Sequence, residues 1–454
     1  MVFLKKNNFW SKESDFFLWV LFFLYTCFVA ISIQFIILPW LVPNLHGGNG
    51  LLQYTDSITY HQTAQARAYI INKEGWQNWL LSPLGQTPAG IASIFYAIFV
   101  PKPWVMIPIY AALHSGSAYI LFKIMSLFEG RSNRGLRIAS VLPFLVFPSA
   151  AFGYAQLHKD SYFIFGNLLF IYVWCLWVQK RNVENTLSLK LFFYYFILWA
   201  LAYILVWIIR PYWGPIFFFI SVLIFIILTL NQIYFLLKEK RAWQKRIIYL
   251  ALSFTVVLAF GMAMQKKNLP SALKSEVPAS EQLSVELKWN PTYWLPVYLD
   301  TQLQNMAITR KAFILKYPEA GTNVDSKIIF HSAREMVSYL PRALYIGFFM
   351  PTISITFQKG VKPGGTLMRW ITGFEMIFIY LCYPFLIMAI WSWRKRLELW
   401  IILFWAIGAI LLYAMVSPNI GALYRFRYGF LMTLTSIGIL RAGILITHRR
   451  AAFT

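Results

Sequence analysis

The chain has 454 residues, of which 59% are hydrophobic and only 13% are charged, and its formal net charge is +24. Soluble domains carry about 25% charged residues, so this composition excludes an ordinary soluble protein. Apolar runs of about 18 residues or more recur along the chain, and each can cross a hydrocarbon core about 30 Å thick. The composition therefore predicts an all-α polytopic membrane protein.

We expect ten transmembrane helices, over residues 16–38, 104–127, 137–155, 161–178, 191–209, 213–236, 247–264, 370–393, 399–416 and 428–446. The first run lacks a small-residue cleavage site, so we expect it to be retained as a helix.

Lys and Arg lie in short clusters between the apolar runs, and this placement argues against a nucleic-acid partner despite the high net charge. The clusters fall within residues 5–12, 131–137, 180–181, 238–246, 394–396 and 449–450. The positive-inside rule places all of them in the cytoplasm, together with both ends of the chain. No Asn-X-Ser/Thr acceptor (X not Pro) occurs, which favours a bacterial inner membrane.

Two outer segments are too long to be simple connectors. The chain is therefore divided into residues 1–264, with seven helices and a first outer loop at 39–103; residues 265–369, a long outer (periplasmic) loop region; and residues 370–454, with three helices. The aromatic and aliphatic side chains of the first loop suit short helices lying in the membrane interface. The second segment is basic, but loops longer than about 60 residues escape the positive-inside rule.

The first outer loop carries a candidate catalytic acid. The stretch LLQYTDSITYHQTAQA contains Asp56, Tyr60 and His61. Spacings of four and five residues place these three side chains on neighbouring faces of one short helix. Asp56 suits a general base at the membrane surface, and a cap at the start of the helix is the alternative role.

A second outer carboxylate lies in GYAQLHKDSYFIFG, where His158, Lys159 and Asp160 follow one another between the third and fourth apolar runs. Asp160 could cap the fourth span, and Lys159 could reach lipid headgroups. A carboxylate on the same side as Asp56 instead favours a shared site.

Three arginines are expected on the same side of the membrane. Arg210 begins the turn RPYWGP, and Arg425 and Arg427 lie in the last outer turn, SPNIGALYRFRYGF. A planar guanidinium suits phosphate through paired hydrogen bonds, whereas a position at headgroup level is the structural alternative.

Glu375 lies inside the eighth span, in WITGFEMIFIY. A charge near a helix centre costs roughly 2.5–3.5 kcal/mol on insertion scales, so we expect Glu375 to face the bundle interior and to have a partner. A structural ion pair is the alternative to a role in the site.

Other motifs carry little. HGGNG lacks the strand–turn–helix context of a nucleotide fingerprint, and no Walker motif, metal-ligand spacing or nucleophile elbow occurs. The three cysteines fall in apolar runs, so we expect packing thiols without a disulfide framework.

The order of these pieces, on one side of the membrane, resembles the GT-C superfamily of membrane glycosyltransferases. The resemblance rests on D-x-x-x-Y-H-x-x-A and P-x-G-I-x-x-I-F in the first outer loop, a K-D-S turn, an R-P turn and a terminal N-x-G-x-x-x-R-x-R. The chain looks most like a bacterial branch, and is more distantly similar to the aminoarabinose transferase of lipid A and the protein mannosyltransferases.

The resemblance implies a GT-C-like fold and an inverting enzyme that transfers a sugar from a polyprenyl-phosphate carrier on the outer face. It implies that Asp56 is the general base, that Asp160 holds the acceptor or a divalent metal, and that Arg425 and Arg427 grip the carrier phosphate. The remaining candidates for substrate binding are Tyr60, His61, His158, Lys159, Arg210 and Glu375.

Two departures from the family pattern matter. Asp56 is followed by Ser57 and not by a second acid, which leaves a divalent cation open; no other cofactor is implied. The acceptor is expected to be a glycan, a lipid or a protein. Because we find no large soluble carboxy-terminal domain, a lipid-linked glycan is favoured over a folded protein.

Two rival functions stay open. A glycan polymerase or ligase would use a polyprenyl-diphosphate-linked glycan, and its usual mark is arginines and a histidine in a long outer loop, here Arg310, His331, Arg334 and Arg342. A lipid or glycan transporter would predict charges at mid-membrane and repeat symmetry, whereas nearly all the charges of this chain cluster at the membrane surfaces.

Overall fold

The computed structural model describes residues 8–129, 133–183, 189–239, 287–316, 318, 320–360 and 364–453. Within these ranges the chain is helical and forms no strand. The helices are α1 Asn8–Ser32, α2 Asp56–Glu74, α3 Thr87–Ile98, α4 Ile107–Phe128, α5 Arg134–Val146, α6 Pro148–Tyr154, α7 Asp160–Val183, α8 Leu189–Ile209, α9 Trp213–Glu239, α11 Val297–Lys316, α12 Ala333–Phe349, α13 Ile353–Thr356, α14 Gly365–Trp393, α15 Leu397–Val416 and α16 Ile420–Phe453. Shorter helical turns cover Ile33–Leu41, Pro43–Leu45, Trp76–Asn78, Pro83–Gly85 and Pro103–Met106. The all-α class is confirmed.

Among the described residues, six helices are long and apolar enough to cross a membrane, which supports an integral membrane protein. They are Asp15–Leu41, Pro103–Phe128, Asp160–Val178, Gly365–Trp393, Leu397–Val416 and Ile420–Thr447. The expected fifth and sixth spans coincide with α8 and α9, whose described apolar parts, Phe193–Ile209 and Trp213–Ile227, are shorter. The expected seventh span, 247–264, lies outside the described residues, as do residues 240–246 and 265–286. The count of ten spans therefore stays a prediction.

The expected third span is not one straight helix. It is broken into α5 and α6, which meet at an angle of 63°. The break falls at Phe147, whose backbone is extended (φ −59°, ψ 128°) ahead of Pro148. A residue that precedes proline is pushed out of the helical region, and proline has no N–H to continue the hydrogen-bond ladder. Proline chemistry therefore ends α5 early and turns the chain sideways before α7.

The last span begins earlier than expected, because α16 starts at Ile420 and so includes both arginines of the expected outer turn. Asn419 precedes it, and the Asn419 Oδ1 accepts a hydrogen bond of 3.0 Å from the Ala422 backbone N–H. An asparagine in this position satisfies one of the free N–H groups of the first turn. Further along, α16 crosses α14 so closely that a Cβ on Gly438 would lie 2.7 Å from the Cys382 carbonyl oxygen.

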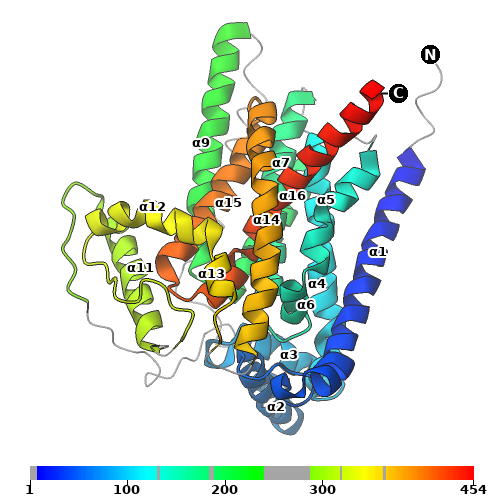
Figure 1. The fold of residues 1–454 in the computed structure, drawn as a ribbon, viewed down its shortest axis with the longest axis vertical. Helices are drawn as coiled ribbons and strands as arrows, with labels where there is room; N and C mark the ends of the chain where they lie inside the picture. The colour runs from blue at the N-terminus through cyan, green and yellow to red at the C-terminus, as the bar shows by residue number, and fades with distance from the viewer. Residues whose placement is uncertain are drawn as a thin grey trace.

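The helices form a bundle whose core is filled by buried apolar side chains, with α7 packed on α4 and α8, and α14 on α16. The two helices of the first outer loop, α2 and α3, lie together at one end of the bundle, opposite the end that holds the carboxyl terminus (Figure 1). The expectation of helices in this loop is thus met, and their position on the outer side of the membrane stays a prediction. On one side of the bundle, α12 packs against α15 and carries α11 and α13 beside it (Figure 1).

Candidate functional site

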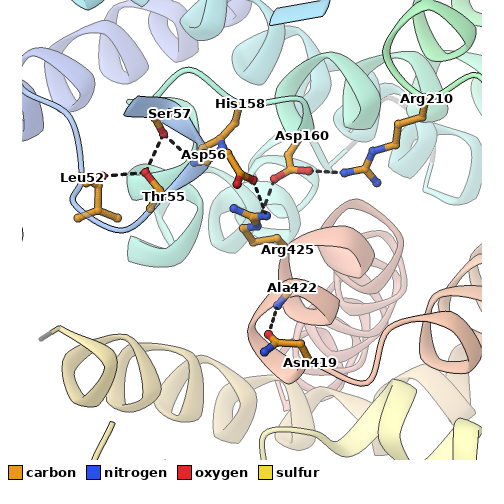
Figure 2. Close-up of polar contacts among 10 residues, drawn as sticks. All are labelled: Leu52, Thr55, Asp56, Ser57, His158, Asp160, Arg210, Asn419, Ala422 and Arg425. Atoms are coloured by element: carbon orange, nitrogen blue, oxygen red, sulfur yellow. Dashed lines mark hydrogen bonds and ion pairs between the residues drawn. The ribbon is translucent and has the colours of Figure 1, made fainter. Parts of the chain in front are cut away.

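Four charged side chains meet at the end of the bundle that holds α2. Asp56 is the first residue of α2, Asp160 is the first residue of α7, Arg210 follows the end of α8, and Arg425 lies in the second turn of α16 (Figure 2). Two helices therefore offer a carboxylate at their amino-terminal ends, where the positive helix end favours negative charge. The chain brings together residues that lie more than 360 positions apart, from 56 to 425.

Arg425 lies between the two carboxylates. Its Nη2 is 3.8 Å from the Asp56 Oδ2, and its Nε is 3.6 Å from the Asp160 Oδ2. These distances are too long for hydrogen bonds and describe charge attraction across a small gap. The structure thus places Asp56 and Asp160 around one guanidinium, as the shared-site hypothesis requires.

Exposure falls steadily from one member of the cluster to the next. The side chains of Asp56 and Arg425 are 55% and 36% exposed, whereas those of Asp160 and Arg210 are 15% and 5% exposed. Asp56 and Arg425 are therefore the members that an incoming molecule can reach. The deeper pair, Asp160 and Arg210, is built into the protein.

Arg210 is held on all sides. Its Nη2 donates to the Asp160 Oδ1 at 2.7 Å and its Nη1 donates to the Tyr413 hydroxyl at 2.6 Å. The guanidinium also lies 4.3 Å from the ring centroid of Phe163 and 4.5 Å from that of Phe426, within the range of cation–π attraction. These contacts fix Arg210 and, through it, the Asp160 carboxylate.

His158 and Lys159 lie beside the acids but are engaged with neighbouring loops. The His158 Nε2 is 3.4 Å from the Ser57 hydroxyl, and the Lys159 ammonium donates to the Gly85 carbonyl at 3.3 Å. The pKa of His158 is lowered to about 4, first by burial and then by the Arg425 guanidinium, against the opposing pull of Asp160 and Asp56. His158 is therefore neutral at pH 7. Burial, followed by the Arg210 guanidinium, also lowers the pKa of Lys159.

Tyr60 and His61 occupy different surroundings. The Tyr60 ring lies 6.0 Å below the Lys159 ammonium, next to the acids, and burial followed by Asp56 raises its pKa. His61 turns towards α3, where its Nδ1 is 2.9 Å from the Tyr96 hydroxyl, and burial followed by Lys102 lowers its pKa to about 4. Tyr60 thus belongs to the rim of the cluster, whereas His61 fastens α2 to α3.

The structure separates the two arginines of α16. Residues two apart on a helix point about 200° away from each other, because each residue turns the helix by about 100°. Arg427 is fully buried and donates to the backbone carbonyls of Ile346, Gly347 and Met350. It ties the end of α12 to α16 and does not join the acid cluster.

Glu375 is satisfied within the bundle. Its carboxylate accepts hydrogen bonds from the Ser149 N–H at 2.9 Å, from the Ser149 hydroxyl at 2.5 Å and from the Tyr424 hydroxyl at 2.6 Å. The expectation of an inward-facing residue with a partner is met, although the partners are hydroxyls and a backbone N–H and not an arginine. Glu375 thereby joins α6, α14 and α16.

The arginines that would suit a polymerase or ligase mostly hold the second outer segment together. Arg310 is 1% exposed and donates to the carbonyls of Asp325, Ile328 and Met415. Arg342 forms a bidentate ion pair with the Asp325 carboxylate, in which its Nε donates to Oδ2 at 2.9 Å and its Nη2 donates to Oδ1 at 3.1 Å. The His331 Nδ1 is 3.0 Å from the Lys288 carbonyl. Arg334 is exposed at the start of α12.

The described residues do not assemble a metal site of the usual kind. Among the described residues, no group of three or more His, Cys, Asp or Glu side chains is placed to hold a metal ion. Asp56 and Asp160 could offer two carboxylates, but the Arg425 guanidinium lies between them, so a cation would have to displace it.

Sequence reasoning missed several residues that shape the cluster. Tyr413 receives hydrogen bonds from Arg210 and from the Trp213 indole, Ser57 contacts His158, and Gln156 joins two loops beside the acids. All are uncharged, and a neutral polar residue at the edge of an apolar run gives no pattern that distinguishes it from a surface residue.

No protein-family model matches this chain, and no curated protein matches it in sequence. Among solved structures, the chain is similar to the archaeal oligosaccharyltransferase AglB from Archaeoglobus fulgidus, solved in complex with an inhibitory peptide and a dolichol-phosphate. The TM-score is 0.45 and the sequence identity is 12%, over 98% of this chain and 52% of that chain. The chain thus spans about half the length of that oligosaccharyltransferase, and a likeness at this level assigns neither family nor activity.

Proposed function

We propose that this protein is a GT-C-like membrane glycosyltransferase, which moves a sugar from a polyprenyl-phosphate carrier to the hydroxyl group of a glycan or lipid-linked acceptor. The observation that carries the proposal is the Arg425 guanidinium held between Asp56 and Asp160 at the end of the bundle. A carrier lipid embedded in the membrane presents its phosphate near this depth. In the cluster, the partly exposed Arg425 can receive this phosphate, and the exposed Asp56 can receive the acceptor.

The charges divide the chemistry between them. The acceptor oxygen attacks the anomeric carbon while its proton passes to the Asp56 carboxylate. The bond between the anomeric carbon and the phosphate oxygen breaks, and its electron pair leaves with the phosphate. Arg425 stabilises the charge of the departing phosphate, and attack from the opposite face inverts the anomeric centre. Asp160, fixed by Arg210, orients Arg425 and the acceptor.

The loose contact between Arg425 and Asp56 suits this division. At 3.8 Å, and with both side chains partly exposed, the pair is weak and easily exchanged for a phosphate oxygen. A phosphate that takes Arg425 leaves the Asp56 carboxylate free to face the acceptor hydroxyl. We place the site on the outer, periplasmic face of a bacterial inner membrane, in accord with the expected charge asymmetry of the loops.

The rival functions fit the described residues less well. Arg310 and Arg342, which a polymerase or ligase would need for its substrate, are engaged with the protein's own carbonyls and with Asp325. Glu375, the acid that a transporter would use within the membrane, is satisfied by Ser149 and Tyr424.

A transfer assay tests the proposal. The protein in nanodiscs is incubated with a panel of polyprenyl-phosphate sugars and lipid-linked glycan acceptors, and the parent is compared with Asp56→Asn. Loss of a general base lowers the rate about 10²–10⁴-fold, whereas donor binding should change little, because Asp56 acts on the acceptor. Asp300→Asn is the matched control, since Asp300 lies in the first turn of α11 and contacts Trp289 and Thr292. Transfer by Asp56→Asn at the parental rate would refute the base assignment.

A further inference from the structure

A single buried amide joins the two loops that precede the aspartates. The Gln156 side chain is 1% exposed, and its Oε1 accepts a hydrogen bond of 2.8 Å from the Leu52 N–H. Its Nε2 donates to the Gly50 carbonyl at 3.1 Å. Gln156 lies four residues before Asp160, and Leu52 lies four residues before Asp56. Both ends of one amide are therefore used to connect the approach to one carboxylate with the approach to the other.

The loop that receives this amide is itself stiff. His46 pairs with Leu52 across an antiparallel bridge, and the Gly50 N–H donates to the His46 Nε2 at 3.0 Å. Gly50 has a φ of +74°, and a Cβ there would lie 2.7 Å from the Cβ of Gln34. Only glycine fits such a conformation and such a close approach. The HGGNG motif thus forms a tightly held loop whose conformation is connected to the position of Leu52.

The loop that carries Gln156 is held from the same side. The Gln34 Nε2 donates to the Ala155 carbonyl at 2.6 Å, and His158 meets Ser57 at 3.4 Å. Together with the amide of Gln156, these contacts link residues 155–158 to the first outer loop and to the end of the first span. Among these residues, Gln156 is the one whose side chain both accepts and donates a hydrogen bond to the first loop.

We propose that Gln156 is a positioning residue, whose amide sets the separation of the Asp56 and Asp160 carboxylates so that Arg425 faces both. Two carboxylates repel each other, and the charge that draws them together is the partly exposed Arg425 at 3.6 and 3.8 Å. Solvent and salt screen that attraction, whereas a buried neutral amide is not screened. Gln156 touches neither substrate nor reacting atoms.

The link from this bridge to turnover rests on the proposed glycosyl transfer, but the bridge itself does not. A displacement of about 1 Å at a catalytic group can cost about 10²-fold in rate. Gln156→Met keeps the side-chain length and removes both hydrogen bonds. We expect kcat to fall about 10–100-fold while the donor KM stays within about threefold, since the Arg425 guanidinium remains in place.

The matched control is Asn167→Leu. Asn167 is 2% exposed and donates a hydrogen bond to the Phe163 carbonyl within its own helix. This variant therefore also loses a buried amide, but the hydrogen bond that it loses does not connect two loops. Hydrogen–deuterium exchange should show faster exchange over residues 50–57 in Gln156→Met, because the Leu52 N–H loses its acceptor, and unchanged exchange there in Asn167→Leu. This readout requires no substrate.

A second variant covers the case in which Gln156→Met fails to fold. The protonated carboxyl of Gln156→Glu can accept a hydrogen bond from the Leu52 N–H and donate one to the Gly50 carbonyl, as the amide does. The ionised carboxylate has no hydrogen to donate, so one of its oxygens faces the Gly50 carbonyl as a second acceptor. Burial raises the pKa of such a carboxyl. The ratio of variant to parental kcat should therefore rise as pH falls, and loop exchange should slow in parallel.

The outcomes separate the two proposals. Unchanged exchange over residues 50–57 in both Gln156 variants would overturn the bridge, whatever the activity. Faster exchange with parental kcat, or a kcat loss that Asn167→Leu shares, would overturn the positioning role. If the parent transfers no sugar from any donor, the proposed function fails, and the exchange rates still decide the bridge.

Discussion

Asp160 and Arg210 form a nearly solvent-free ion pair, in which the Asp160 Oδ1 and the Arg210 Nη2 lie 2.7 Å apart. Removing one partner of such a pair leaves an uncompensated buried charge, which costs about 3–5 kcal/mol. We therefore expect Arg210→Met to lower the free energy of unfolding by about that amount, as measured by thermal denaturation in detergent. The double variant with Asp160→Asn should lose less than the sum of the two single variants. Additive losses would show that the two residues do not act as a pair.

The two arginines of α16 should respond in opposite ways to substitution. Arg425→Ala removes a charge-assisted contact with the carrier phosphate, so it should weaken donor binding with little effect on the melting temperature. Arg427→Ala leaves the carbonyls of Ile346, Gly347 and Met350 without their donor, so it should lower the melting temperature. Titration with a polyprenyl phosphate, alongside thermal denaturation, distinguishes these effects. Equal loss of donor binding in two stable variants would return Arg427 to the site.

Arg425→Lys refines this prediction. Lysine keeps the positive charge but cannot form paired hydrogen bonds with phosphate, so donor binding should recover only in part relative to Arg425→Ala. Full recovery would mean that Arg425 contributes charge alone.

Stability should depend on pH through His158. Burial lowers its pKa to about 4 in the folded protein, from about 6.5 for a histidine in water. Between these values the unfolded chain binds more protons than the folded one, so the contribution of a neutral His158 is fully present above about pH 6.5 and is lost as pH falls towards 4. A gap of this size corresponds to about 3 kcal/mol.

Melting temperatures between pH 4.5 and 7.5 check this dependence. His158→Gln removes the titrating ring, so its melting temperature should fall less on acidification than that of the parent. His331→Gln, in the second outer segment beside Lys288, serves as the control. Identical pH profiles for the parent and His158→Gln would contradict the prediction.

The topology can be read by cysteine labelling in a background without Cys27, Cys175 and Cys382. Tyr54 lies just before α2 and is 53% exposed, and Lys395 is exposed in the turn between α14 and α15. Helix α2 and the turn between α14 and α15 lie at opposite ends of the bundle (Figure 1). An impermeant thiol reagent added to intact cells should label Tyr54→Cys and spare Lys395→Cys. The reverse labelling pattern would show that the protein has the opposite orientation in the membrane.

Much of the fold follows from the lengths of the apolar runs, because a membrane span needs about 20 apolar residues. The sequence also indicated that Asp56, Asp160, Arg210 and Arg425 share one side. It does not separate Arg425 from Arg427, because the apolar run predicts a span that begins only at residue 428, whereas α16 begins at Ile420 and includes both arginines. The break at Pro148 gives no signal in hydropathy, because the apolar run continues across it while the backbone hydrogen bonds do not.

The neutral contacts could not be predicted. Gln156, Ser57 and Tyr413 depend on which loops approach each other, and that is set by packing over separations such as the 203 residues between Arg210 and Tyr413. A charged residue in an apolar context signals a cost that must be met somewhere. An amide or hydroxyl at a span end signals no such cost.

The cluster also has an order of assembly. Asp160 and Arg210 come from α7 and the turn after α8, so they can neutralise each other while the later part of the chain is still being synthesised. Arg425 enters only with the last helix, and Tyr413 only with the one before it. The order of synthesis thus allows the deep ion pair to form before Arg425 is present, and the cluster of four charged side chains cannot be complete until α16 has been made.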